Sequence, residues 1–310
     1  MTMQTHTDLK KILVPVPLNS DMTDALTQAL RLQQVYGSEI TMLTIVSRYS
    51  IFHRMLNPEK LNKHRKKAKR RLKKLVKKYF KGEIPGNVKL KVEDGGLIST
   101  ILKTAKGIDA DLIIIKKARR LPGRFKFLKT ENADRLIAES LCPVLTVAHH
   151  PTPGEIRTIM IPVEILKPSE NKIAWAISLA KQFNAGLHLV SVLDADIKVR
   201  SSLSYKQSRK IEKVIRSQGI EVKKEVIKSN GDHPGKEVLQ HAASVNPDML
   251  VIMTRKESLI RDHYLGSFAR EIIHHSQVPV FNVVPATDHI PFDVLRPKHQ
   301  RAKNSSKQTT

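Results

Sequence analysis

The feature that most constrains this chain is an internal repeat of roughly 140 residues. From Lys10, the stretch KKILVPVPLNSDMTDALTQALRLQQVYGSEITMLTIVS is echoed from Arg157 by RTIMIPVEILKPSENKIAWAISLAKQFNAGLHLVSVLD. Further on, DADLIIIKKARR is echoed by NPDMLVIMTRK, and ADRLIAESLCPVLTVA by AREIIHHSQVPVFNVV. Similarity over such a length predicts two copies of one domain.

Within each copy the hydrophobic pattern alternates between strand and helix. Short β-branched runs such as Ile12–Val16 and Leu112–Ile115 are apolar on both faces, as buried parallel strands must be. Between them, as from Ala25 to Leu32, apolar residues recur at the spacing of a helix that packs on a sheet. This order predicts the α/β class, with an open five-stranded parallel sheet flanked by helices in each copy. Ligands of such sheets bind beyond the carboxyl ends of the strands.

The domain boundaries follow from the repeat and from local composition. We expect a first domain over residues 1–150 and a second over 151–290, joined by the short proline-rich segment HHPTPG. Residues 291–310 are polar and basic, which is typical of a disordered tail.

Composition limits the class of protein. The N-terminus lacks the apolar core of a signal peptide, and no apolar run approaches the ~18–20 residues of a membrane span, so we expect a cytoplasmic protein. Cys142 is the single cysteine, which excludes an intrachain disulfide and suits an inert, buried thiol. The net charge of +25 predicts an acidic partner: nucleic acid, anionic lipid or an acidic protein.

The order of these elements and the closing segments LCPVLTV and QVPVFNVV resemble the universal stress protein family. The resemblance covers residues 10–148 and 157–284. It implies a tandem member with two Rossmann-like (adenine nucleotide alpha hydrolase-like) domains and a non-enzymatic, regulatory role in the stress response. Nucleotide-binding members have a first strand that ends in aspartate and a G-x2-G-x9-G-[ST] motif. Its glycines let backbone amides approach phosphates at a helix N-terminus.

The second copy keeps part of that motif. Gly266 and Ser267 stand at the Gly-Ser position, although the same pair also fits an ordinary turn and helix cap. Glu164 replaces the aspartate and keeps a carboxylate for a ribose hydroxyl, and Val192 matches the family's adenine-side valine. Met253 and Lys256 stand where the family has the two earlier glycines. The resemblance thus implies a degenerate nucleotide or anion site, for ATP or AMP, at Glu164, Val192, Met253, Lys256, Gly266 and Ser267.

The first copy matches the motif less well. Its glycine positions fall near Lys116 and Arg119, and Pro17 replaces the aspartate. Thr130 and Glu131 replace Gly-Ser, and a carboxylate in the first turn of a helix repels a phosphate. The resemblance also implies an intramolecular pseudo-dimer, with the closing strands 143–148 and 279–284 near each other, and leaves a further homo-oligomer open.

A strongly basic segment is the feature that the family does not explain. Residues 60–81 hold 13 Lys or Arg and no acidic residue, and an apolar stripe at helical spacing predicts an amphipathic helix over about 57–81. The corresponding segment of the second copy contains Glu212 and far fewer bases, so the fold does not require this charge. The alternative function is therefore polyanion binding, with RNA, DNA and anionic lipid all open. Its candidate residues are Lys66, Lys67, Arg70, Arg71, Lys73 and Lys74.

Catalysis finds little support. The sequence contains no nucleophile elbow, Walker loop or G-x-G-x-x-G fingerprint. The 13 histidines form no spaced metal motif with cysteine. The pairs at 149–150 and 274–275 lack nearby carboxylates in sequence and are interpreted as solvent-facing or helix-end histidines. We therefore expect no catalytic residue, no metal site and no enzymatic activity.

Overall fold

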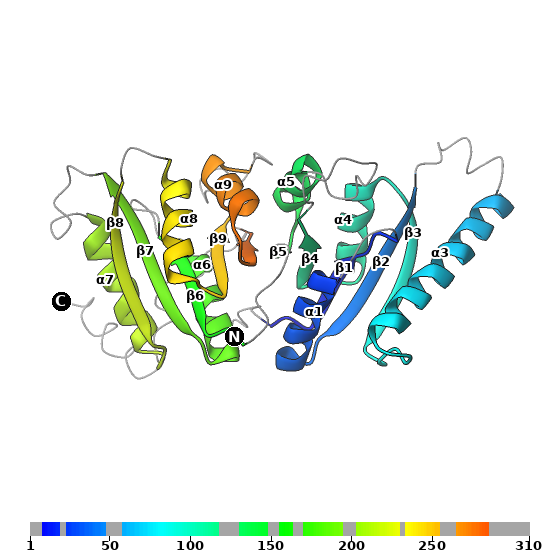
Figure 1. Cartoon of the computed structure of the whole chain (residues 1–310), viewed down its shortest axis with the longest axis horizontal. Coiled ribbons are helices and arrows are strands. Elements are labelled where there is room, and N and C mark those ends of the chain that lie inside the picture. The colour runs from blue at the N-terminus through cyan, green and yellow to red at the C-terminus, as the bar shows by residue number, and fades with distance from the viewer. Residues whose placement is uncertain are drawn as a thin grey trace, which may run out of the picture. The chain divides into compact units, whose positions relative to one another are not determined.

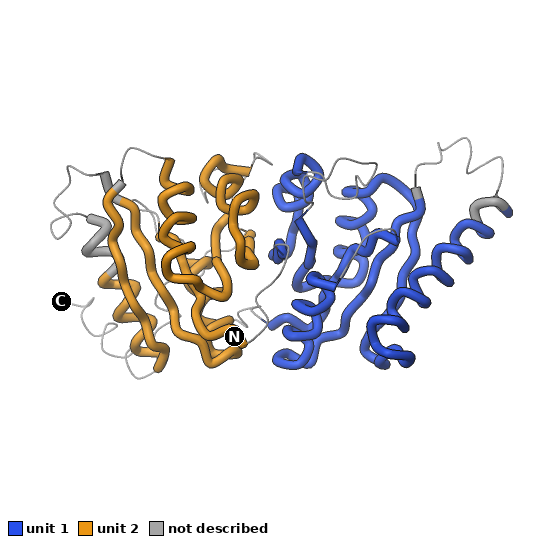
Figure 2. Tube along the Cα trace, viewed as in Figure 1, with its two compact units in different colours: residues 1–151 blue, residues 152–310 orange. Residues whose placement is uncertain are grey.

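The structure, a computed structural model, divides into two compact units, Met1–Pro151 and Thr152–Thr310 (Figure 2). The linker and the C-terminal tail lie outside the described residues. The residues that the structure describes are 8–18, 23–47, 58–117, 130–147, 155–163, 170–194, 203–229, 233–254 and 265–284.

The first unit is an open parallel sheet with strand order β3-β2-β1-β4-β5 (Figure 1). Its elements are β1 (Lys11–Pro15), α1 (Thr23–Tyr36), β2 (Glu39–Ser47), α3 (Pro58–Tyr79), β3 (Val88–Gly95), α4 (Leu97–Gly107), β4 (Leu112–Lys116), α5 (Thr130–Glu139) and β5 (Val144–Val147).

The second unit repeats this plan, with strand order β8-β7-β6-β9-β10 and all strands parallel. Its elements are β6 (Thr158–Pro162), α6 (Glu170–Phe183), β7 (Gly186–Asp194), α7 (Leu203–Arg216), β8 (Val222–Ser229), α8 (Pro234–Val245), β9 (Met249–Met253), α9 (Ser267–His275) and β10 (Val280–Val283). The predicted α/β class with two Rossmann-like sheets is confirmed.

Helices cover both faces of each sheet. In the first unit α1 and α3 share one layer, where the hydroxyls of Thr27 and Tyr79 lie 3.0 Å apart, and α4 packs against α5. In the second unit α8 packs against α9. Central strands such as β4 and β9 are buried on both faces because helices cover them, which explains their continuous apolar runs.

The repeat extends to single hydrogen bonds. Oδ2 of Asp111 accepts from the amides of Lys10 and Lys11, at 2.9 and 2.8 Å. Oδ2 of Asp248 accepts in the same way from the amides of Arg157 and Thr158, at 2.8 and 2.9 Å. In each unit this carboxylate joins the start of the fourth strand to the start of the first.

Among the described helices, none is both long and apolar enough to cross a bilayer.

Candidate functional site

The strand order of the second unit reverses between β6 and β9, so the carboxyl ends of these strands border the crevice where open α/β sheets bind ligands. β6 ends at Pro162 and β9 at Met253. The amide of Gly266, just before α9, donates to the carbonyl of Thr254 at 3.5 Å. Val192 lies near the end of β7, beside β6. The predicted residues Val192, Met253 and Gly266 therefore lie at the same end of the sheet.

Gly266 is the N-cap of α9, and no side chain among the described residues caps this helix. Its φ of −59° and ψ of 150° suit any residue, and a Cβ built on it meets no atom of the described residues within 4 Å. Neither backbone conformation nor packing demands glycine here. Ser267, the first helical residue, is exposed. An uncapped N-terminus keeps its free amides and the positive end of the helix dipole, which attract an anion.

A buried lysine at the same end of the sheet was missed by sequence reasoning. Lys172, in the first turn of α6, is only 4% exposed, and its Nζ donates to the carbonyl of Pro162, the last residue of β6, at 2.7 Å. The lysine places its amine beside the crevice. Lys172 aligns with Ala25 of the first copy, so neither the repeat nor the hydrophobic periodicity indicates a buried lysine at this position. The other two predicted site residues, Glu164 and Lys256, lie outside the described residues.

The equivalent end of the first sheet is organised differently. Lys116, which ends β4 and aligns with Met253, lies with its Nζ 2.5 Å from Oδ2 of Asp24 in α1. Both side chains are largely buried, so this ion pair fills the place where the second unit has Met253 and Asn171. Glu131 is exposed in the first turn of α5. This geometry favours an anion at the second unit over the first.

The basic segment forms α3, which packs on β2 and β3 through a narrow stripe. Ala68, Leu72 and Val76 are buried, whereas Leu75 is half-buried. Arg65 of the stripe forms an ion pair with the carboxylate of Asp94 in β3. Ten other cations of α3 face solvent, and none of these ten has an acidic partner among the described residues. They are Lys63, Lys66, Lys67, Lys69, Arg70, Arg71, Lys73, Lys74, Lys77 and Lys78.

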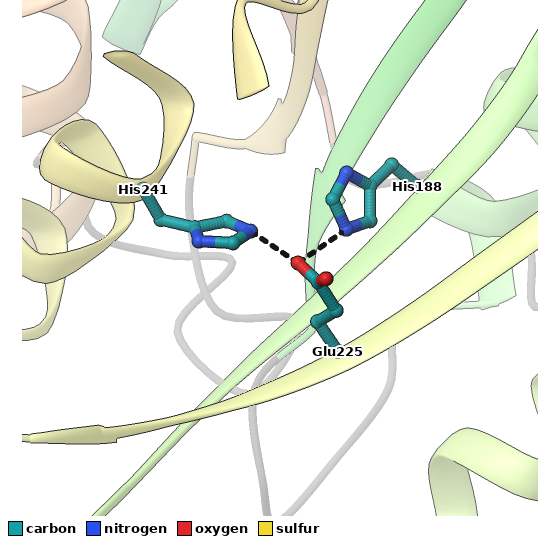
Figure 3. A group of neighbouring side chains, drawn as sticks. All are labelled: His188, Glu225 and His241. Carbon is teal, nitrogen blue, oxygen red and sulfur yellow. Dashed lines mark hydrogen bonds and ion pairs between the residues drawn. The ribbon is translucent and has the colours of Figure 1, made fainter. Parts of the chain in front are cut away.

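Three metal-ligating side chains meet on the second sheet beneath α8 (Figure 3). His188 is the third residue of β7, Glu225 the fourth of β8, and His241 belongs to α8. Oε2 of Glu225 lies 3.0 Å from Nε2 of His188 and 2.7 Å from Nε2 of His241. The rings are edge to face, with centroids 5.3 Å apart. Figure 3 shows both rings directed at one carboxylate oxygen.

The protonation states of this cluster follow from its surroundings. Burial lowers the pKa of His188, against the opposing charge of Glu225, so its imidazole is neutral near pH 7. The pKa of Glu225 is lowered, first by the hydrogen bond from Lys223, whose Nζ lies 2.8 Å from the other carboxylate oxygen. A neutral imidazole and an ionised carboxylate are the forms that bind metal ions.

Sequence reasoning missed this cluster because no short spacing connects its members. His188 and Glu225 are 37 residues apart and face one another only because β7 and β8 pair in parallel with His188 opposite Lys223. The pair at 274–275 does lie in the last turn of α9, as expected of helix-end histidines. One part of that interpretation was wrong: His275 has a carboxylate partner one turn earlier, with Nδ1 3.3 Å from Oε1 of Glu271.

Each unit is thus a Rossmann-like α/β domain with a helix N-terminus at the crevice where its strand order reverses. The chain belongs to the universal stress protein family, whose sequence model matches it twice, over residues 8–148 and 155–283. The predicted tandem arrangement is confirmed. No curated protein matches the chain.

Solved structures show the same fold over nearly the whole chain. A universal stress protein from Archaeoglobus fulgidus DSM 4304 has a TM-score of 0.66 at 19% identity, covering 91% of this chain and 98% of that one. A putative universal stress protein from Pseudomonas aeruginosa UCBPP-PA14 has a TM-score of 0.58 at 17% identity, covering 97% and 100%. The cytoplasmic domain of a prokaryotic cation chloride cotransporter has a TM-score of 0.50 at 13% identity, covering 90% and 97%.

Proposed function

We propose that this chain is a non-enzymatic, cytoplasmic stress-response protein whose second unit binds a nucleotide such as ATP or AMP, or another phosphate-bearing anion. The observation that carries the proposal is the uncapped N-terminus of α9 at Gly266, with open space where a side chain would stand. A half-buried glycine that neither packing nor backbone angles require is suited to close approach by a phosphate. The buried amine of Lys172, held at the carbonyl that ends β6, is a further hydrogen-bond donor beside the same crevice.

The test relies on position 266 accepting a side chain without strain or collision. Aspartate fits its backbone angles and the open space, and it is a favoured N-cap, so Gly266→Asp should fold as stably as the wild type. Its carboxylate would occupy the positive end of α9, and we expect ATP affinity, measured by isothermal titration, to fall about tenfold or more.

Two controls separate charge from size and one unit from the other. Gly266→Asn has nearly the same shape without the charge, so it should bind ATP better than Gly266→Asp. Thr130→Asp adds the same carboxylate at the equivalent position of the first unit and should leave binding unchanged. Heat release by Gly266→Asp equal to that of the wild type would remove the nucleotide proposal without touching the family assignment.

A second candidate function is favoured by the exposed cations of α3. Because they lack acidic partners among the described residues, they are available to phosphates of nucleic acid or anionic lipid. Replacing Lys66, Lys67, Arg70, Arg71, Lys73 and Lys74 with Gln should abolish binding to RNA or anionic vesicles at about 100 mM salt. Retained binding would contradict this function.

The two candidate functions belong to different units and do not exclude each other. The anion site rests on residues of the second unit, and the polyanion surface rests on α3 of the first. An acidic partner, the intramolecular pseudo-dimer and a further homo-oligomer remain parts of the proposal. Analytical ultracentrifugation of the intact chain, with and without ATP, measures whether it forms a homo-oligomer.

A further inference from the structure

We propose that His188, Glu225 and His241 form a binding site for a divalent transition-metal ion, and that Zn²⁺ is the ion their chemistry fits best. The three side chains come from β7, β8 and α8, and their ligand atoms all lie within 4.8 Å of one another. Because two adjacent strands and a packed helix hold them, the site is built into the scaffold of the second unit (Figure 3).

The distances suit a tetrahedral ion after a small adjustment. Zn–N and Zn–O bonds of 2.0–2.2 Å place neighbouring ligand atoms about 3.3–3.5 Å apart. The two Nε2 atoms lie 3.0 and 2.7 Å from Oε2 of Glu225, so the carboxylate has to move away from them by roughly 0.3–0.8 Å. The ligand atoms of the two histidines lie within 4.8 Å of each other, so the rings also have to adjust to the ion. Glu225 is the most exposed of the three, at 31%, against 2% for His188 and 15% for His241. It is the ligand most able to move.

The ligand set selects the kind of metal. Two imidazoles and one carboxylate suit Zn²⁺ and other first-row ions, whereas Mg²⁺ and Ca²⁺ prefer all-oxygen sites. Three protein ligands leave a fourth position for water. Lys223 donates to the other oxygen of Glu225 at 2.8 Å, which orients the carboxylate so that Oε2 faces the histidines. Its own charge opposes a cation, but its side chain is 65% exposed and screened by solvent.

The first unit shows that the fold does not require this cluster. The third residue of β2 is Thr41 and the fourth of β3 is Lys91, at the places of His188 and Glu225. Thr104 stands at the place of His241. Each lies five residues before the left-handed residue that follows its helix, Asp109 in the first unit and Asn246 in the second. The same scaffold thus accepts two threonines and a lysine. Histidines and a carboxylate at all three places are a property of the second unit.

The metal site is separate from the proposed anion site. His188 lies near the amino end of β7, whereas Val192 lies near its carboxyl end. Four residues along a strand span ~13 Å. Loss of one site should therefore leave the other intact, and each can be tested without the other.

The experiment uses the full-length, untagged chain stripped of metal, titrated with Zn²⁺ against a chromophoric chelator. We expect one ion per chain, and an affinity more than about 100-fold weaker in Glu225→Gln and His241→Asn. A third variant carries the first unit's residues, His188→Thr, Glu225→Lys and His241→Thr, and should bind no ion at this site. Because the first unit folds with these residues, this variant keeps the test valid if a single substitution unfolds the chain.

Two further readouts distinguish a built site from scattered surface histidines. Zn²⁺ should raise the melting temperature of the wild type but not that of the triple variant. Co²⁺ should give the intense visible absorption of tetrahedral coordination in the wild type alone. Equal Zn²⁺ affinity in wild type and triple variant, or a Co²⁺ spectrum like that of the hydrated ion, would overturn the proposal.

Discussion

Cys142 shows how its surroundings decide what a single residue can do. The thiol is half-buried just before β5, with Sγ 3.7 Å from Oγ of Ser140. Burial raises the pKa of the Cys142 thiol to about 11, from an ordinary value of 9.0. At pH 8 the folded chain therefore holds roughly 100-fold less thiolate at this residue than the unfolded chain. A residue that composition marks only as a lone cysteine is held in its unreactive form.

We therefore predict that Cys142 resists thiol reagents. At pH 8 a chromogenic disulfide reagent should label the native chain far more slowly than the chain in denaturant. The protonated thiol is favoured in the folded state, so its contribution to stability is complete below pH 9 and is lost as the pH rises through about 11. Cys142→Ser should remove that high-pH loss. Native labelling at the unfolded rate would contradict the prediction.

Site residues differ in how far sequence can predict them. Gly266 and Ser267 were identified because a family motif preserves their spacing, and the structure puts them at a helix start beside the end of β9. Lys172 and the His188 cluster carry no such signal. Their roles depend on the strand order and the register of β7 with β8, which a hydrophobic period of two or 3.6 residues does not encode.

At the scale of elements, the apolar pattern predicted α3 well and its finer packing less well. The stripe of Ala68, Leu72 and Val76 is buried as the periodicity indicates. Leu75 and Val76 are adjacent and both apolar, and the structure buries Val76 fully but leaves Leu75 half-buried. Arg65 interrupts the apolar stripe because Asp94 of β3 provides an ionic partner.

The stability of α3 should depend on this stripe and not on its charges. Leu72 is fully buried, so Leu72→Ala should lower the free energy of unfolding by about 2–5 kcal/mol. Lys73 is the adjacent, exposed residue, and Lys73→Ala should change the free energy of unfolding by less than about 0.5 kcal/mol. Urea unfolding followed by circular dichroism measures both. A small effect of Leu72→Ala would mean that α3 is not anchored through this stripe.

At the scale of the whole molecule, the question is whether the net charge of +25 or its concentration on α3 governs polyanion binding. A diffuse charge raises the encounter rate with any polyanion, whereas adjacent cations on one helix release many counterions at once. Only the second mechanism makes binding depend on where the positive charges lie.

Two variants of equal net charge decide between them. One replaces the six candidate cations of α3 with Gln, and the other replaces six exposed cations elsewhere: Lys103, Lys106, Lys181, Arg209, Lys213 and Lys228. If α3 is the binding surface, the first variant should lose RNA binding and flatten the plot of log affinity against log salt, because that slope counts the phosphates neutralised. The second should keep most of the affinity and the slope. Equal losses in both variants would show that the molecule binds through its overall charge and that α3 has no special role.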